Sequence, residues 1–220
     1  SPACKYWVTW HQSVAGAGRA RRATIIAARS PMPDNANPIS DVLLTGPQIQ
    51  RRVAALGAAI TADYAGLDPM LVGVLRGVVL FMADLMRAIP IPFTVDFLAI
   101  SSYGAQSQPG QVRLLKDLES SIEGRHVLFV EDMVDTGLTL HTLLRMLGER
   151  QPASLHVCTL CDKPRLRLVK LPLRYIGFQL PDRYVVGYGL DYRQRYRNLP
   201  YVGALSAHVL LPGAAGSQPP

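Results

Sequence analysis

Short apolar runs alternate with amphipathic helical segments along the middle of the chain, and this alternation restricts the possible folds more than any other feature. Apolar runs that alternate with helices of about 10–15 residues are typical of βαβ units, which build a parallel sheet. We therefore predict an α/β fold in which a central, mostly parallel, twisted sheet is flanked by helices. The expected strands are 70–75, 93–100, 112–116, a run that begins at Val127, and 155–160.

The expected helices lie between Thr45 and Gly66, over 78–88 and over 139–147. The first of them has a recognisable start, because Thr45-Gly-Pro-Gln48 has the pattern of a capping box. Gly66 is the expected stop. The residues that share its apolar face are Ile49, Val53, Leu56 and Ile60.

Length and composition predict one folded domain with extensions at both ends. A chain of 220 residues, 49% of them hydrophobic, suits a single domain of about 150–200 residues. Residues 1–36 hold five Lys or Arg and one acid, and residues 212–220 are rich in Gly and Pro. We expect 1–36 to be a flexible extension, with a targeting segment as the alternative, 37–207 to be the folded domain, and 208–220 to be a disordered tail.

The cysteines and the apolar tracts indicate a cytoplasmic protein. Three cysteines suggest no disulfide framework, and Cys158 and Cys161 lie in an expected strand, where two buried thiols are a better interpretation than a metal site. The longest apolar tract, 71–93, is broken by Arg76, Asp84 and Arg87. A membrane span needs about 20 largely uncharged residues, so we expect no membrane partner.

Charge is distributed unevenly along the chain. The net charge is +7, and residues 160–198 hold nine Lys or Arg against three acids. Residues 37–159 hold twelve acids against nine basic residues. A basic C-terminal third that faces an acidic middle can clamp an anionic small molecule, and it can equally bind nucleic acid. Charge alone does not decide between these two classes.

The segment V-L-F-V-E-D-M-V-D-T-G-L-T-L (127–140) leads from a buried strand into three acids that we place after its end. Ligands of open parallel sheets bind at the carboxyl ends of the strands. A solvated turn that caps the next helix explains one acid, but not Glu131, Asp132 and Asp135 together. Asp-Thr-Gly also occurs in aspartic proteases, but those are all-β, and the motifs G-x-x-x-x-G-K-[ST] and G-x-G-x-x-G are absent.

A sugar-phosphate site remains as the physical interpretation of this segment. Backbone N–H groups of a Thr-Gly-x-Thr turn at a helix N-terminus bind a phosphate dianion. Glu131 and Asp132, just upstream, can accept hydrogen bonds from neighbouring ribose hydroxyls. Asp135 would then lie nearer the anomeric carbon, where proton transfer is useful.

The same segment resembles the phosphoribosyl-pyrophosphate (PRPP) motif of the type I phosphoribosyltransferases. From about residue 38 to 205 the chain is similar to the hypoxanthine-guanine members of that family. Five motifs in the same order make the resemblance specific. Besides 127–140 they are L-V-G-V-L-R-G (71–77), V-D-F-L-A-I-S-S-Y-G (95–104), D-K-P (162–164), and P-D-R-Y-V-V-G-Y-G-L-D-Y (181–192) with Arg197 soon after.

The resemblance implies a fold, a reaction and partners. A small hood would cover the active site of the parallel sheet. The enzyme would act in purine salvage, transferring 5-phosphoribosyl from PRPP to N9 of hypoxanthine or guanine and giving IMP or GMP and pyrophosphate. Mg²⁺ would be the cofactor, the partners would be small substrates and not nucleic acid, and the chain would form a homodimer or homotetramer. The alternatives are a nucleic-acid-binding regulator with this fold and a xanthine-preferring transferase.

The resemblance also implies a role for each matched residue. Asp135 would be the catalytic acid or base, Ser102 and Tyr103 would belong to a mobile lid, and a non-proline cis peptide would be usual in the turn at 75–77. Ribose and 5′-phosphate would be bound by Glu131, Asp132, Asp135, Thr136, Gly137, Leu138 and Thr139. Pyrophosphate would be bound by Leu75, Arg76, Gly77 and Arg197. The purine would be bound by Lys163, Tyr184, Val185 and Asp191, and the metal by Glu131, Asp132 and Asp191.

Two positions depart from the family pattern. Arg76 stands where Lys is common, so the charge persists on a different group. Val78 stands where a small residue is common, and a β-branched side chain there restricts the turn. Both changes bear on pyrophosphate affinity.

Overall fold

The computed structural model describes residues 37–102 and 112–210, which form two sheets. The larger sheet has six strands in the order β4-β3-β2-β5-β6-β7, and all neighbours are parallel except the antiparallel pair β3 and β4. The predicted α/β fold with a mostly parallel sheet is therefore confirmed. Its strands are β2 (Met70–Leu75), β3 (Thr94–Ser102), β4 (Val112–Lys116), β5 (His126–Val134), β6 (Ser154–Asp162) and β7 (Leu173–Gln179).

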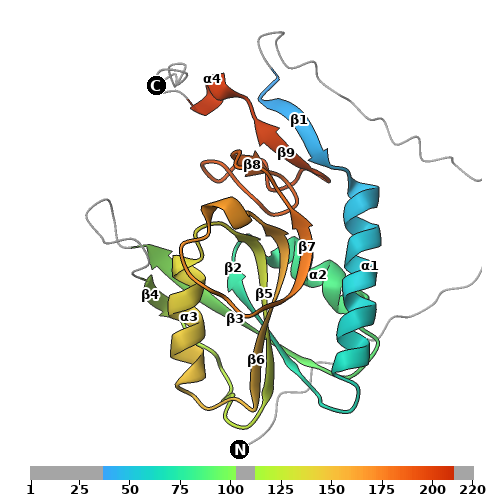
Figure 1. Cartoon of the computed structure of the whole chain (residues 1–220), viewed down its shortest axis with the longest axis vertical. Helices are drawn as coiled ribbons and strands as arrows, with labels where there is room; N and C mark the ends of the chain where they lie inside the picture. The colour runs from blue at the N-terminus through green and yellow to red at the C-terminus, as the bar shows by residue number, and fades with distance from the viewer. Residues whose placement is uncertain (1–36, 103–111, 211–220) are drawn as a thin grey trace, which may run out of the picture. The chain divides into compact units, whose positions relative to one another are not determined.

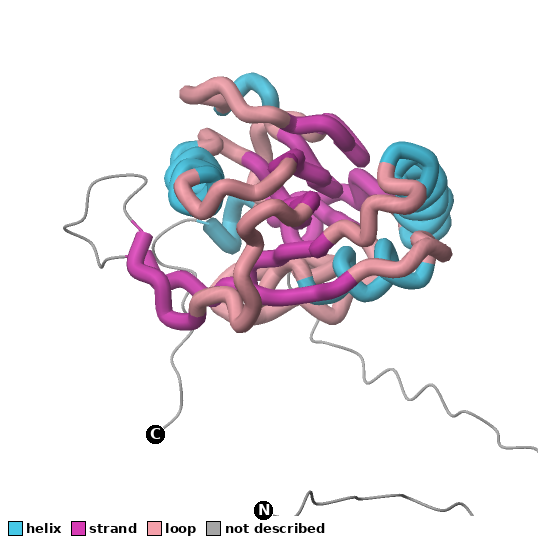
Figure 2. The backbone as a smooth tube through the Cα atoms, turned by 90° about the horizontal axis from the view of Figure 1, so that it is seen from below, coloured by secondary structure: helices cyan, strands magenta, loops and turns pink. Residues whose placement is uncertain are grey.

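Helices cover both faces of this sheet (Figures 1 and 2). Helices α1 (Gly46–Asp63) and α2 (Val79–Arg87) pack on one face, and α3 (Leu138–Gly148) packs on the other. Side chains alternate along β5, so Leu128 and Val130 join the α1 and α2 layer while Val127 and Phe129 join the α3 layer. Complete burial of such a side chain contributes about 1.5–3 kcal/mol, which makes this unbroken apolar run the centre of both cores.

A three-stranded antiparallel sheet forms the hood, in the order β1-β9-β8. Its strands are β1 (Ile39–Leu44), β8 (Val185–Val186) and β9 (Val202–Leu205), and the short helix α4 (Ala207–Leu210) follows them. The hood has a small core of its own, made by Ile39, Val186 and Leu205. Figure 1 shows it beyond one end of the larger sheet, so residues from the start and the end of the domain lie side by side.

Helix α1 follows the expected pattern. The backbone N–H of Thr45 donates to Oε1 of Gln48 over 2.8 Å, which is the Gln half of the capping box. The helix ends at Asp63, before Gly66, whose φ of 77° lies in the left-handed region that glycine favours. The whole expected apolar face is buried: Ile49, Val53, Leu56 and Ile60.

One sequence expectation about the acids is wrong. Strand β5 continues to Val134, so Glu131 and Asp132 lie within the strand and not after it. The reason is that β6 extends equally far beside it and pairs Glu131 with Thr159 and Val134 with Asp162. The two cysteines of β6 are buried free thiols.

The expected terminal segments fall mostly outside the described residues. Residues 1–36 and 211–220 lie there, as does Tyr103 of the expected lid, while α4 continues three residues beyond 207. Among the helices that the structure describes, none is long and apolar enough to cross a bilayer.

Candidate active site

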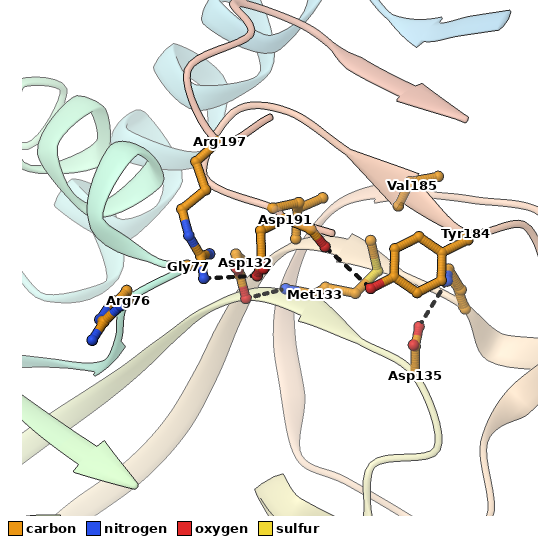
Figure 3. Close-up of a pocket in the computed structure, with 11 residues that line it drawn as sticks. Arg76, Gly77, Asp132, Met133, Asp135, Tyr184, Val185, Asp191 and Arg197 are labelled. Carbon is orange, nitrogen blue, oxygen red and sulfur yellow. Dashed lines mark hydrogen bonds and ion pairs between the residues drawn. The ribbon is translucent and has the colours of Figure 1, made fainter. Parts of the chain in front are cut away.

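A cavity of about 340 Å³ lies at the carboxyl ends of the central strands, beneath the hood (Figure 3). Its volume falls within the range of small-molecule sites, about 300–1,000 Å³. It brings together most of the predicted site residues from four separate segments. Those that line it are Arg76, Gly77, Asp132, Asp135, Lys163, Tyr184, Val185, Asp191 and Arg197, and Met133 and Leu190 join them.

The other predicted residues that the structure describes are not part of the cavity lining. Leu75 ends β2, Ser102 ends β3, and Glu131 lies in β5 one residue before Asp132. Of the remaining four, Thr136 and Gly137 form the turn into α3, and Leu138 and Thr139 are the first residues of that helix.

Burial shifts the two carboxylates of β5 towards their neutral forms. It raises the pKa of Asp132 to about 6, although Oδ1 accepts the N–H of Met133 over 2.8 Å. Burial and then the charge of Asp132 raise the pKa of Glu131 well above its ordinary value. The Oε2 atom of Glu131 is buried and has no hydrogen-bond partner within the described chain. An acceptor without a partner beside a second carboxylate suits a ligand that supplies donors.

The turn that leads into α3 follows β5 at its carboxyl end. Gly137 precedes the first helical residue with a φ of 82°, which glycine adopts without a Cβ penalty. Its carbonyl accepts the N–H of His141 over 2.8 Å and so begins the helical bonding. The N–H groups of the first helical turn have no helical acceptors, and with the helix dipole they form an anion site.

Lys163 is buried, with 7% of its side chain exposed, and its ammonium lies 3.1 Å from Oδ1 of Asp135. It is therefore not a solvated surface lysine. Its backbone N–H donates to the carbonyl of Val134 over 2.9 Å, which fixes the end of β6 against the end of β5. A cation and a carboxylate thus meet at one point of the cavity wall, and a ligand can bind both.

The hood supplies an aromatic face. Tyr184 is 46% exposed, and its hydroxyl donates to the carbonyl of Asp191 over 3.1 Å (Figure 3). The ring of Tyr192 packs against it in a T-shaped arrangement, with centroids 5.4 Å apart and planes at 83°. Val185 is buried beside it. A planar heterocycle can stack on the free face of Tyr184.

The turn after β2 approaches the hood closely. The peptide bond between Leu75 and Arg76 is cis, as the resemblance implies. A Cβ at Gly77 would collide with the carboxylate of Asp132, and one at Gly189 would collide with the carbonyl of Gly77. Glycine at positions 77 and 189 therefore allows the backbone of this turn to lie between a carboxylate and the hood.

Two arginines line the same side of the cavity. Arg197 pairs with Oδ1 of Asp191 at 2.7 Å and donates to the carbonyl of Gly189 over 2.6 Å. Arg76 donates to Oε1 of Gln194 over 3.1 Å, and Arg197 donates to the same atom over 3.3 Å. Gln194 is a contact residue that the sequence did not reveal, because it lies among exposed polar residues without a motif.

The carboxylates fit a magnesium ion that is shared with a phosphate ligand. Mg²⁺ binds through one or two carboxylates together with substrate phosphate oxygens. Asp132 and Asp191 line the same cavity, whereas Glu131 does not line it. Within residues 37–102 and 112–210 no three acids, histidines or cysteines gather closely enough to hold an ion alone.

A parallel sheet with a hood, a helix that begins just after the central strand and a buried lysine paired with an aspartate are the features expected of a phosphoribosyl transferase. The model of the phosphoribosyl transferase domain matches residues 40–193, and the chain belongs to this family.

Within this family, the chain is similar to the hypoxanthine and hypoxanthine-guanine phosphoribosyltransferases. The hypoxanthine-guanine phosphoribosyltransferase of Mycobacterium avium is 52% identical over 178 residues, which cover 78% of this chain and 88% of the relative. The hypoxanthine phosphoribosyltransferase of Salmonella typhimurium is 49% identical, and the match covers 74% of this chain and 93% of the relative. The crystal structure of a hypoxanthine phosphoribosyltransferase from Staphylococcus aureus superposes with a TM-score of 0.77 at 44% sequence identity. The superposition covers 80% of this chain and 96% of that structure.

Proposed function

We propose that the chain transfers the 5-phosphoribosyl group of PRPP to N9 of hypoxanthine or guanine, giving IMP or GMP and pyrophosphate in purine salvage. The observation that carries this proposal is the ion pair of the buried Lys163 with the half-exposed Asp135, 3.1 Å apart in a cavity that Tyr184 also lines. A cation and an acid side by side suit the edge of a 6-oxopurine, which has an acceptor at O6 and a nitrogen at N7.

The purine is recognised by residues of β6 and the hood. Tyr184 stacks on the ring, and Lys163 donates to O6. Adenine has an amino donor at that position, so it would place donor against donor and be rejected. Main-chain groups near Val185 and Asp191 face C2 of the purine.

The proton is handled by Asp135. As N9 bonds to the anomeric carbon and pyrophosphate leaves, Asp135 accepts the proton from N7 of the purine. Lys163 holds the carboxylate in place through their ion pair. In the reverse reaction Asp135 returns the proton.

The phosphoribosyl group is held by β5 and the turn into α3. Glu131 and Asp132 accept hydrogen bonds from the ribose hydroxyls, because Asp132 lines the cavity and Oε2 of Glu131 has no partner within the described chain. Thr136, Gly137, Leu138 and Thr139 bind the 5′-phosphate through backbone and hydroxyl donors.

Pyrophosphate is held by the turn Leu75-Arg76-Gly77 and by Arg197. The backbone donors of the turn and the guanidinium groups stabilise the charge that develops as pyrophosphate departs. Asp132 and Asp191 would hold Mg²⁺, with Glu131 adjacent, and the ion would neutralise pyrophosphate oxygens. Gln194 keeps Arg76 and Arg197 close together in the free protein.

The remaining expectations concern the surroundings of the site. Ser102, at the end of β3, would begin the lid that closes over PRPP. We further propose a homodimer or homotetramer in the cytoplasm, with small-molecule partners.

A spectrophotometric assay with PRPP, Mg²⁺ and each of hypoxanthine, guanine, xanthine, adenine and uracil tests the proposal. We expect turnover with hypoxanthine or guanine and none with adenine or uracil. A preference for xanthine would correct the substrate. An absence of turnover with every base, together with salt-sensitive RNA binding, would refute the enzyme and favour a nucleic-acid-binding regulator.

A further inference from the structure

Arg167 lies behind the turn into α3 and has an unusual environment. It follows a single 3-10 turn, η1 (Pro164–Leu166), and only 16% of its side chain is exposed. Its Nη2 atom forms an ion pair with Asp162, which is 5% exposed. Its Nη1 atom is buried without a hydrogen-bond partner in the described chain. A buried charged donor without an acceptor is costly, so its retention needs a reason.

The unpaired end of Arg167 points at the residue that begins the phosphate turn. A Cβ placed on Gly137 would lie 2.9 Å from Nη1 and 3.2 Å from Cδ of Arg167. The next residue, Leu168, donates its backbone N–H to the carbonyl of Thr136 over 3.0 Å. Arg167 therefore lies directly behind Gly137, together with Cδ1 of Leu171 at 2.8 Å from the same Cβ position, and the chain beside it is bonded to the same turn.

The same segment is bonded to the site at its other end. The backbone N–H of Lys163 donates to the carbonyl of Val134, and its ammonium pairs with Asp135. Residues 163–168 thus connect Lys163, which we propose faces the purine, to Thr136 and Gly137 of the turn into α3. A movement of Arg167 would be transmitted to both.

The ion pair is also oriented. Asp162 lies at Nη2, and the uncompensated Nη1 lies towards Gly137, so the pair is a dipole with its positive end at the phosphate turn. The N-terminus of α3 adds a partial positive charge at the same place. In a partly buried setting such charges act through an effective dielectric constant of about 20, and they add where a phosphate dianion binds.

We propose that Arg167 is a positioning residue of the 5′-phosphate turn, which holds Gly137 in its left-handed conformation and strengthens phosphate binding from behind. This inference rests on the proposed function and deepens it at the phosphate end of PRPP. Arg167 does not touch the reacting atoms. It selects for the 5′-phosphate, and it leaves pyrophosphate to the turn after β2 and Arg197.

A purely structural ion pair would behave differently, and two variants separate the cases. If the pair only stabilised the fold, loss of either partner would have the same effect. Under our inference, Arg167→Met removes the positive end and weakens phosphate binding. Asp162→Asn keeps an acceptor for Nη2 and leaves the arginine charge less compensated, so phosphate binding is retained or strengthened.

Isothermal titration of ribose 5-phosphate and of pyrophosphate into the full chain and its variants provides the test. We expect Arg167→Met to bind ribose 5-phosphate about tenfold more weakly than the wild type. Arg167→Lys should lose less of this affinity, and Asp162→Asn should lose none of it. Pyrophosphate affinity should stay unchanged in all three. In turnover, Arg167→Met should raise the KM for PRPP with little change in kcat.

Three results would overturn the inference: wild-type affinity for ribose 5-phosphate in Arg167→Met, equal losses in Arg167→Met and Asp162→Asn, or no binding by the wild-type chain. If Arg167→Met does not fold in a thermal melt, a loss in Asp162→Asn as large as in Arg167→Lys overturns it. A wild-type chain that binds ribose 5-phosphate and makes no nucleotide refutes the proposed function and leaves this comparison valid.

Discussion

Replacing Asp132 by Asn should stabilise the ligand-free protein at neutral pH. Burial raises the pKa of Asp132 to about 6 from an ordinary value of 3.8. At about 1.4 kcal/mol per pH unit, the ionised carboxylate costs the folded chain about 3 kcal/mol above pH 6. Between these two pH values the folded chain keeps a proton that the unfolded chain has released. The free energy of unfolding therefore falls as the pH rises from about 4 to about 6.

Chemical denaturation at pH 4 and at pH 8 measures this effect. Asp132→Asn carries no charge at either pH, so it should exceed the wild type by up to about 3 kcal/mol at pH 8 and match it closely at pH 4. Asp182→Asn is the control, because it removes the same charge from an exposed residue. An equal difference at both pH values would refute the reasoning, since a gain unrelated to ionisation does not depend on pH.

Four further outcomes are expected. Asp135→Asn should bind PRPP normally but lose about 10²–10⁴-fold in turnover, measured by single-turnover kinetics, and unchanged turnover would remove Asp135 from the chemistry. Lys163→Ala should raise the KM for hypoxanthine more than the KM for PRPP, and efficient use of adenine by the wild type would contradict its role. Gly189→Ala should lower the stability by at least about 1 kcal/mol in denaturation, because its φ is 98° and a Cβ meets the carbonyl of Gly77, and a wild-type midpoint would contradict this. Chelation should abolish turnover and Mg²⁺ should restore it, whereas activity in excess chelator would exclude the ion.

The order of the elements could be predicted from the sequence because each element carries its own periodicity. Strand β2 has the predicted bounds, and α1 buries the predicted face. The residues at which the elements end were less predictable. Nothing local shows that Glu131 and Asp132 continue a strand, because their extended conformation depends on pairing with β6, whose contribution comes from a distant part of the chain.

The motifs were enough to predict most of the residues that line the cavity, whereas the residues that contact them from behind could not be predicted. Lys163 and Asp135 were expected in one site, and they lie 3.1 Å apart. Arg167 and Gln194 were missed. The importance of Arg167 depends on its distance to Gly137 and on an unpaired atom, and no spacing in the sequence encodes either. The role of Gln194 could not be predicted because it depends on Arg76 and Arg197, which come from different segments and donate to the same oxygen atom.

The hood carries a consequence for how the protein is made. Strand β1 near the start of the domain pairs with β9 near its end, and Ser206 bonds to Pro38 over 2.9 Å. During synthesis the larger sheet can be complete once β7 has emerged from the ribosome, and with it the turn into α3. The aromatic face of Tyr184 takes its place only after β9 has emerged and closed onto β1. A nascent or truncated chain that stops before Val202 would therefore keep the turn into α3 and Lys163, and would lack the hood that positions Tyr184.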